Sequence, residues 1–563
     1  MIVSNSRIDN NLAVGAANAD GIGGGINNSA TATLINCTVS SNTAEGISAS
    51  GTATGGGINN SGTVTLTNCT VSSNSVSGGV ASAGGIARGG GIANDSGTVN
   101  LDKCTVSGNS ATGGTGGGGG IANEDGTVTL ENSTVSGNSA TPGAGTPAAD
   151  AVASGGLFNV GGTTTLNHST VTANTAAEGS LQPSCAVFNN VGSLELKNTI
   201  VAGNTASFDL FSVESDAVAS GGFNLIGRTN VLILPGTNDR FNIAGAELKL
   251  GPLQDNGGPT NVLHTFTHAL LCGSPAIDAG DNTDAPDTDQ RGLPRIFNGV
   301  IDIGAYEDRN TAPTVLCPTP STLEANSSTG LVAAVTVQVT DADGDELVVV
   351  LSVDGIAVRT NLVAAGGPPT AATTTFTATF RPGTHSILVR VIDTKQCVAT
   401  CSTTVLVTPA QGCELYPIAL HEKSLAGVRI GSVIKDIYNG IQPGNFGWLT
   451  WAGSPSEPTL VRSLTRPGNS GTYFNPSAPN DHIVSVGDWV QGKPGVSNGR
   501  QVRDALDALK QIDITVPVWN QARGTGNNSL YRVSAFARVR LISYQLPREN
   551  RISARFLGFV SCN

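Results

Sequence analysis

The sequence predicts a mainly β protein, in which a parallel β-helix is followed by an immunoglobulin-like β-sandwich and then by a C-terminal β-rich module of the α+β class. Three observations predict this fold. A segment repeats every 29 to 36 residues over the first 204 residues, its apolar residues alternate with polar ones, and longer alternating runs replace the Gly-rich repeats after residue 310. Solenoids repeat with such a period, and strands alternate with a period of two.

The composition limits the classes of partner. A chain of 563 residues is too long for a single core, so we expect several domains. Its formal net charge is −12, and residues 1–204 contain only four lysines and arginines, which argues against a nucleic-acid partner. No stretch approaches the roughly 20 apolar residues that a membrane span needs. We therefore expect neither nucleic-acid binding nor a membrane span.

Each repeat reads G-G-G-I-x-N, then T-V-T-L-x-N, then C-T-V-S-x-N. In Thr63–Leu66, Val64 and Leu66 face one way and the threonines face the other. We predict about three strands per repeat and about seven coils over residues 1–247, stacked in parallel about 4.8 Å apart. The sequence starts within a repeat, so we expect the native N-terminus to be truncated there. The last Asn of successive repeats is Asn11, Asn42, Asn74, Asn109, Asn138, Asn174 and Asn204.

Two positions of the repeat predict columns along the axis. The last Asn tolerates left-handed backbone and can bond to its equivalents, so it predicts a corner with a ladder of amides. A second position carries only small side chains, and we interpret it as an internal column. A metal ladder or disulfides are the alternative, but no His or carboxylate repeats beside this position. Its residues are Cys37, Cys69, Cys104, Ser133, Ser169 and Thr199.

Residues 1–230 resemble the right-handed parallel β-helix of pectate-lyase-like and polymorphic-outer-membrane-type repeat proteins. The right-handed coiling is implied by this resemblance only.

Residues 248–310 carry four motifs in order: L-G-P-L-Q-D-N-G-G-P-T, G-S-P-A-I-D-A-G-D-N, T-D-Q-R-G and D-I-G-A-Y-E. This succession is similar to the choice-of-anchor domain, type Q, of bacterial surface proteins, which implies an extracellular location and attachment without catalysis. We expect the segment to cap the end of the helix. Asp278, Asp281 and Asp289 could hold Ca²⁺, but Asx turns and an Asp–Arg291 pair are the favoured interpretation.

Residues 311–409 contain about seven short alternating runs, which predict the sandwich. Cys317 and Cys401 are placed to join its ends by a disulfide. The sequence D-A-D-G-D carries Asp341, Asp343 and Asp345, which could bind Ca²⁺. A plain Asp/Gly turn is favoured, because the distal Glu of the EF-hand pattern does not follow.

Residues 410–563 are bracketed by Cys413 and Cys562, for which we predict a disulfide. Residues 502–512 have helical spacing, and β runs follow at 514–519, 531–537 and 554–560. The segments G-N-F-G-W-L, V-P-V-W and Y-R-V-S-A-F-A resemble a module of tight-adherence pilus-associated proteins, which implies a cell-surface context.

These observations favour a bacterial, non-catalytic structural or adhesive protein that is secreted or displayed on the cell surface. Its expected partners are cell-surface or matrix components such as polysaccharide, and no cofactor is expected other than Ca²⁺. A polysaccharide lyase or hydrolase is disfavoured because no basic residue or carboxylate pair repeats in the helix, where His168 is interpreted as a surface residue.

Two non-catalytic alternatives are open. The helix end could pair with another copy and build a filament. The outward threonines could stack into an ice-binding array, although Thr is also a common exposed strand residue. These threonines are Thr31, Thr33, Thr63, Thr65, Thr127, Thr129, Thr163 and Thr165.

Overall fold

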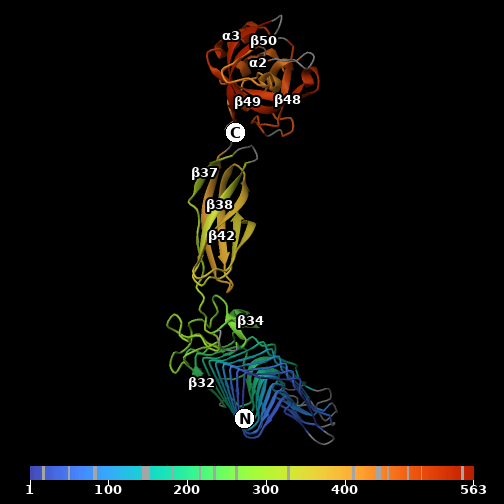
Figure 1. Cartoon of the computed structure of the whole chain (residues 1–563), viewed down its shortest axis with the longest axis vertical. Coiled ribbons are helices and arrows are strands. Elements are labelled where there is room, and N and C mark those ends of the chain that lie inside the picture. Colours follow the sequence, from blue (N-terminus) through green and yellow to red (C-terminus); the bar gives the residue numbers. More distant parts are fainter. Residues whose placement is uncertain are drawn as a thin grey trace. The chain divides into compact units, whose positions relative to one another are not determined.

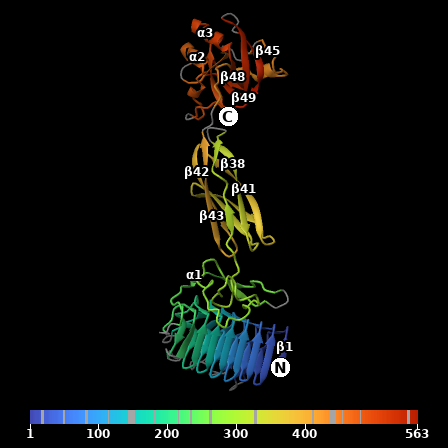
Figure 2. The same cartoon turned by 90° about the vertical axis from the view of Figure 1, so that its left-hand side faces the viewer.

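The fold is given by a computed structural model of the chain (Figures 1 and 2). The structure describes residues 1–562 except 16–19, 48–50, 80–84, 114, 143–152, 179–182, 215–216, 232–235, 260–263, 326–329, 409–411, 436, 438–444, 453–454, 479–480, 496 and 547–550. The chain divides into two compact units, Met1–Ala312 with Asp393–Cys397, and Pro313–Ile392 with Val398–Asn563. Among the described residues, no helix is long and apolar enough to cross a bilayer.

The repeats form a parallel β-helix, as predicted, whose equivalent strands pair in register from coil to coil (Figure 2). We call the sheet of the T-V-T-L segments the hydroxyl sheet and the sheet of the T-V-S segments the cap sheet. The hydroxyl sheet contains β1 (Ile2–Ser4), β6 (Thr31–Ile35), β11 (Thr63–Thr67), β16 (Thr98–Asp102), β21 (Thr127–Glu131), β25 (Thr163–Asn167), β29 (Ser193–Lys197) and β32 (Val218–Gly222). The cap sheet contains β2 (Arg7–Asp9), β7 (Thr38–Ser40), β12 (Thr70–Ser72), β17 (Thr105–Ser107), β22 (Thr134–Ser136), β26 (Thr170–Thr172), β30 (Ile200–Val201) and β33 (Leu225–Ile226).

Three further parallel sheets complete the helix, so the early coils have five strands each instead of the expected three. The extra strands form because the Gly- and Ala-rich segment between repeats also pairs from coil to coil. One sheet contains β5 (Ile26–Asn28), β10 (Ile58–Asn60), β15 (Ile92–Asn94), β20 (Ile121–Asn123), β24 (Ser154–Asn159), β28 (Cys185–Asn189) and β31 (Phe208–Ser212). The second contains β3 (Leu12–Gly15), β8 (Thr43–Gly46), β13 (Ser75–Ser77), β18 (Ser110–Gly113), β23 (Ser139–Pro142) and β27 (Thr175–Ala176). The third contains β4 (Gly21–Ile22), β9 (Ala53–Thr54), β14 (Ile86–Arg88) and β19 (Thr115–Gly117).

Polar ladders run inside the helix beside the apolar columns. The predicted Asn ladder is confirmed: Asn74 Nδ2 donates to Asn109 Oδ1 at 2.9 Å, and Asn109 Nδ2 donates to Asn138 Oδ1 at 2.9 Å. Each amide therefore accepts from one coil and donates to the next. The last, Asn204, donates to Asp209 Oδ1 at 2.9 Å, and this carboxylate can end the ladder because it needs no further acceptor.

The small-residue position also forms an internal ladder, in which each backbone N–H donates to the side chain of the next coil. Cys37 N donates to Cys69 Sγ at 3.3 Å, and Cys104 N donates to Ser133 Oγ at 3.1 Å. These thiols are fully buried and are not in disulfides. Burial raises the pKa of Cys104 well above its ordinary range, which makes it a poor nucleophile.

Two expectations about the helix corners are wrong. The residue before each ladder Asn is left-handed, for example Ser73 with φ +56°, and the ladder amides themselves point inward. Left-handed asparagines do mark the corner before the small-residue position, at Asn36, Asn68, Asn132 and Asn198. His168 is 3% exposed and is not a surface residue: its Nδ1 lies 2.7 Å from Glu131 Oε1, and Asn198 Nδ2 lies 3.0 Å from its Nε2. The corner position is buried at this coil because Asn198 and its own partner Asp281 cover it.

The segment expected to cap the helix end lies along its side instead. The end is covered by residues 227–231 and 236–243, where Arg240 N donates to Asn224 O and Phe241 packs against the core. Residues 245–259 and 264–307, which we call the lateral segment, lie over the cap sheet (green in Figure 2). They contain α1 (Gly245–Leu248), β34 (Leu250–Gln254) and β35 (Thr267–Leu270). Ile200 on β30 and Leu225 on β33 pack against this segment. The outer face of the last coils is apolar, so burial favours this lateral position.

One glutamine shows how this lateral contact is built. Gln290 Nε2 donates to Thr105 Oγ1 at 2.9 Å, and its Oε1 accepts from Thr134 Oγ1 at 2.6 Å. One side chain thus bridges neighbouring coils. Gly304, with φ +101°, passes so close to β26 that a Cβ would lie 2.7 Å from Thr170 Oγ1.

The second unit contains the predicted sandwich. A three-stranded sheet, β36-β38-β41, faces a five-stranded sheet, β37-β43-β42-β39-β40, around one hydrophobic core. The alternating runs at 335–339 and 387–391 put their odd-numbered Val and Ile residues inside. The strands are β36 (Thr314–Leu316), β37 (Ser321–Glu324), β38 (Leu331–Asp341), β39 (Leu347–Val353), β40 (Ile356–Val363), β41 (Thr370–Phe380), β42 (Gly383–Ile392) and β43 (Val398–Thr408).

The described residues of the C-terminal module form a mixed sheet and two α-helices, as expected of an α+β module. The predicted helix is α3 (Arg500–Leu509), which buries Val502, Leu506 and Leu509 along one face. The other helix is α2 (Glu457–Leu464), and short 3₁₀ turns lie at Glu422–Leu425, Ser470–Thr472 and Gly526–Asn528. The sheet contains β44 (Leu420–His421), β45 (Val433–Ile434), β46 (Asn445–Thr450), β47 (Trp489–Pro494), β48 (Asp513–Arg523), β49 (Leu530–Gln545) and β50 (Arg551–Val560).

Candidate interaction surface

The cysteines singled out in the sequence lie in two disulfides, Cys317–Cys401 and Cys413–Cys562. The structure adds a third, Cys272–Cys397, which sequence reasoning missed. Counting would have found it: once the repeat cysteines are set aside and the two expected pairs are made, only Cys185, Cys272 and Cys397 remain. Cys185 is a repeat residue inside the helix, so the other two are left to pair.

The D-A-D-G-D turn is organised by one carboxylate. Asp341 is 1% exposed, and its Oδ1 accepts the backbone N–H groups of Asp343, Gly344 and Asp345 at 2.9–3.1 Å. This is the Asp/Gly turn favoured above. Within the described part of the chain, no three His, Cys, Asp or Glu side chains form a group that could hold a metal ion.

The acidic residues of the lateral segment are likewise directed to different partners. Asp281 Oδ2 lies 3.3 Å from Lys197 Nζ, and Asp289 Oδ2 lies 2.7 Å from Arg291 Nη2. Asp278 instead donates its backbone N–H to Asp302 Oδ1 at 2.7 Å. The structure therefore does not bring Asp278, Asp281 and Asp289 together, and the weighed Asp–Arg291 pair is present.

Asp341→Ala is expected to destabilise the second unit by about 2–4 kcal/mol, because one buried and two part-buried N–H groups lose their shared acceptor. Thermal unfolding checks this, with Asp343→Asn as the control. If the turn instead depends on Ca²⁺, EGTA will lower the melting temperature of the unaltered protein as strongly as the substitution does. We expect EGTA to have no such effect.

The hydroxyl sheet and the cap sheet both carry outward hydroxyl groups but differ in exposure. The lateral segment covers the later strands of the cap sheet, so Thr105 and Thr134 are 0% exposed, whereas Thr38 and Thr70 on earlier strands are half-buried. No described segment covers the hydroxyl sheet in this way, and its outward threonines are exposed or half-buried. The hydroxyl sheet is therefore a regular face that a partner can reach. The sheet of β13, β18 and β23 carries another column of half-buried hydroxyl groups, at Ser75, Ser110 and Ser139.

The outward residues of the hydroxyl sheet form registered columns. The first column contains Thr31, Thr63, Thr98, Thr127, Thr163 and Ser193, and the second contains Thr33, Thr65, Asn100, Thr129, Thr165 and Glu195. Paired strands lie about 4.8 Å apart, and outward residues two positions apart are separated by about 6.6 Å along a strand. These two columns make a grid of groups that both donate and accept hydrogen bonds, with one charge at Glu195. A third column at the end of the same strands contains Thr67, Asp102, Glu131, Asn167 and Lys197, and so carries further charges at one edge of the sheet. Two of the charged residues of the third column are already paired, Glu131 with His168 and Lys197 with Asp281.

The titratable groups with strongly shifted pKa values lie elsewhere and are buried. In the lateral segment, burial raises the pKa of Asp302 to about 7 and that of Glu307 to about 8. Their exposed fractions are 1% and 0%, so neither carboxyl group can reach a polymer on the surface. Asp302 and Glu307 are therefore part of the buried interior of the lateral segment.

A buried Lys–Ser pair in the C-terminal module was not found from the sequence, since Lys493 and Ser497 form no recognisable motif. Lys493 Nζ donates to Ser497 Oγ at 2.6 Å, and burial lowers the pKa of the lysine. A base beside a hydroxyl group is the arrangement of many nucleophilic sites. Ser497, however, is 0% exposed, so the hydroxyl group cannot attack a substrate in this conformation.

The module also has an open surface depression of about 350 Å³ beside the Cys413–Cys562 disulfide. Glu414, Asp513, Arg466 and Arg538 line it, so its acidic and basic side chains balance. Asp513 is already paired with Arg540 and lies 3.7 Å from Arg538. The depression therefore offers no excess charge to a ligand.

No protein-family model matches the chain, and no curated protein matches it either. Among solved structures, it is similar to the fibronectin(III)-like modules of Clostridium thermocellum CbhA, at 21% identity and a TM-score of 0.14 over 18% of this chain and 48% of that one. The matched region thus spans about half of that structure.

Two other similar structures are the CARDB domain of the PF1109 protein from Pyrococcus furiosus and a glucan-utilization protein. The CARDB domain is 18% identical, with a TM-score of 0.14 over 17% of this chain and 92% of that one. Bacteroides ovatus SGBP-B, in complex with a mixed-linkage heptasaccharide, is 11% identical, with a TM-score of 0.14 over 43% of this chain and 66% of that one. Scores this low indicate nothing about function.

Proposed function

We propose that the chain is a secreted or cell-surface structural and adhesive protein, which binds a neutral polysaccharide through the hydroxyl sheet and catalyses no reaction. The observation that carries this proposal is the registered grid of Thr, Ser and Asn side chains on that sheet. A neutral polysaccharide also presents regularly spaced hydroxyl groups, so it can exchange many hydrogen bonds with the grid without ion pairs.

Other features support an extracellular, non-catalytic protein. Three disulfides are typical of an oxidising compartment. The carboxyl groups with the most strongly raised pKa values, and the Lys–Ser pair, are buried and lack access to a substrate. Hydrolysis of a glycoside needs two carboxyl groups that reach the sugar.

Assembly of the chain into a filament through the end of the β-helix has less support than polysaccharide binding. Head-to-tail stacking of helices needs an open strand edge at both ends of the helix. Residues 227–231 and 236–243 cover the last coil: Ile226 N donates to Arg240 O, and Val231 packs into the core.

Sedimentation with insoluble neutral polysaccharides tests the proposal. We expect Thr65→Lys with Thr129→Lys to weaken binding at least tenfold, because two long charged side chains would stand on the grid. Thr112→Lys is the matched control, since Thr112 is exposed on β18 in another sheet of the same helix. Equal loss in both variants, or release of reducing or unsaturated sugars, would overturn the proposal. Thermal hysteresis without polysaccharide binding would assign the grid to ice instead.

A further inference from the structure

Two of the disulfides close consecutive loops of the chain. Cys272–Cys397 spans 125 positions and Cys413–Cys562 spans 149. Only 16 positions separate Cys397 from Cys413, and the single strand β43 fills most of this interval. A covalent route therefore runs from Cys562 to Cys413, along β43 to Cys397, and across to Cys272.

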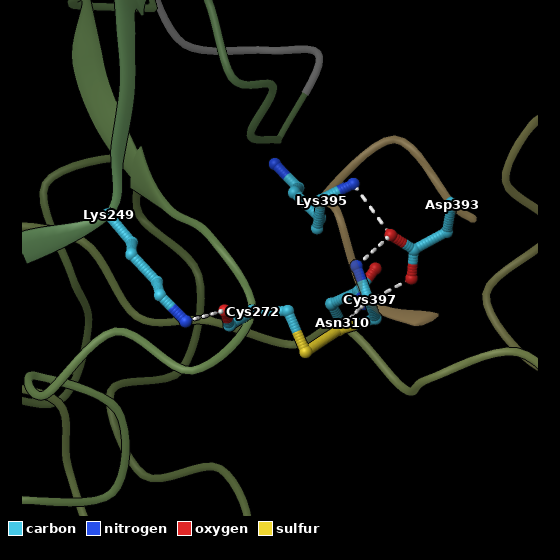
Figure 3. Close-up of a disulfide and its surroundings, with 6 residues drawn as sticks. All are labelled: Lys249, Cys272, Asn310, Asp393, Lys395 and Cys397. Carbon is cyan, nitrogen blue, oxygen red and sulfur yellow. Dashed lines mark hydrogen bonds between the residues drawn. A yellow bond between two sulfur atoms is a disulfide. The ribbon is translucent and has the colours of Figure 1, made fainter. Parts of the chain in front are cut away.

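The first of these disulfides is held in place by a dense polar network within the first unit (Figure 3). Cys272 N donates to Lys395 O at 2.8 Å. Asp393 Oδ1 accepts from the backbone N–H groups of Lys395 and Cys397 at 2.8 Å each, and its Oδ2 accepts from Asn310 Nδ2 at 2.8 Å. Cys397 is 5% exposed, which protects the bond from thiols in solution.

We infer that this arrangement is a tension-bearing device, in which force between the chain ends bypasses most of the lateral segment, the sandwich and the C-terminal module. Covalent bonds carry the load along the shortest connected route, so residues 273–396 and 414–561 lie in closed loops outside it. The inference rests on the proposed role as an attached surface protein, because only an anchored protein that holds a partner experiences such force.

The third disulfide supplies a reserve route. Cys317 lies inside the first loop and Cys401 lies four positions beyond its end, on β43. With all bonds present, Cys272 and Cys413 are joined through 16 residue positions. If Cys272–Cys397 is lost, the route through Cys317–Cys401 contains 57 positions, and without either bond it contains 141. The two bonds are therefore not additive in their effect on length.

Single-molecule pulling on the full chain, with handles at both termini, measures the length of the covalent route for each set of disulfides. Cys317→Ser with Cys401→Ser is the matched control and should leave the fully extended length unchanged. Cys272→Ser with Cys397→Ser should add 41 residues, or about 140 Å, and all four substitutions together should add 125 residues, or about 430 Å, at about 3.4 Å per residue.

A longer chain in the control pair, or equal lengths in all variants, would overturn the inference. If a variant does not fold, peptide mapping of the unaltered, unreduced protein decides the matter, because it must recover the three pairs and no other. Polysaccharide sedimentation of the same variants separates the two proposals. The lengths can follow the expected order whether or not the hydroxyl sheet binds sugar.

Discussion

Asn109→Ala is expected to destabilise the β-helix by about 3–5 kcal/mol, although the substitution removes only one small amide. Asn109 is 0% exposed, and its Oδ1 accepts from both the backbone N and the Nδ2 of Asn74 at 2.9 Å. Its Nδ2 donates to Asn138 Oδ1 and to Val71 O at 2.9 Å. Alanine would leave two buried donors without an acceptor and remove a donor from two acceptors, and each unpaired buried group costs about 1–3 kcal/mol.

Chemical denaturation followed by circular dichroism measures this loss. Asn59→Ala is the matched control, because the half-buried Asn59 points outward from the same helix and donates to Asn27 Oδ1 at 3.2 Å. We expect the control to cost less than about 1 kcal/mol. Similar losses in both variants would show that the internal ladder contributes no more than a surface amide pair does.

The ladder also shows how far the sequence could be interpreted. Its position was predictable because a buried Asn that recurs every coil has only its own equivalents to bond with. The structure also contains a second ladder, which the Asn of each G-G-G-I-x-N motif forms. In it, Asn60 Nδ2 donates to Asn94 Oδ1 at 2.8 Å. It was missed because only the last Asn of each repeat was considered as a ladder position.

The position of the lateral segment could not be derived from the sequence. The outward residues of the cap sheet, such as Thr105 and Thr134, are the same type as those of the exposed hydroxyl sheet. Only Ile200 and Leu225, where that outward column becomes apolar, indicate a covered face. The candidate surface was predicted as an array of threonines, but which sheet remains free depends on long-range packing that local patterns do not contain.

The buried carboxyl groups of the lateral segment should make the first unit less stable as the pH rises from about 5 to 8. Asp289, Asp302, Glu307 and Asp308 outnumber the nearby Arg291 and Arg295, so the folded segment retains protons. Burial raises the pKa of Glu307 to about 8 and that of Asp302 to about 7, well above the values of about 4 in an unfolded chain. The folded state then binds more protons than the unfolded state, so its stability is complete below about pH 4 and declines until the pH passes the folded pKa.

The expected slope is about 1 kcal/mol per pH unit for each titrating group. Hydrogen exchange of residues 288–308, corrected for the intrinsic pH dependence of exchange, reports it locally. Glu307→Gln should lower the slope by the contribution of one group, because the amide cannot ionise while Asp302 still titrates. The amide also loses one of the two N–H groups that the carboxyl group accepts from Phe297 and Asp302. Asp284→Asn, exposed in the same segment, should leave the slope unchanged. A slope that Glu307→Gln leaves unchanged would mean that this carboxyl group is already ionised at pH 5 and is neutralised by Arg295, so that burial does not control its titration.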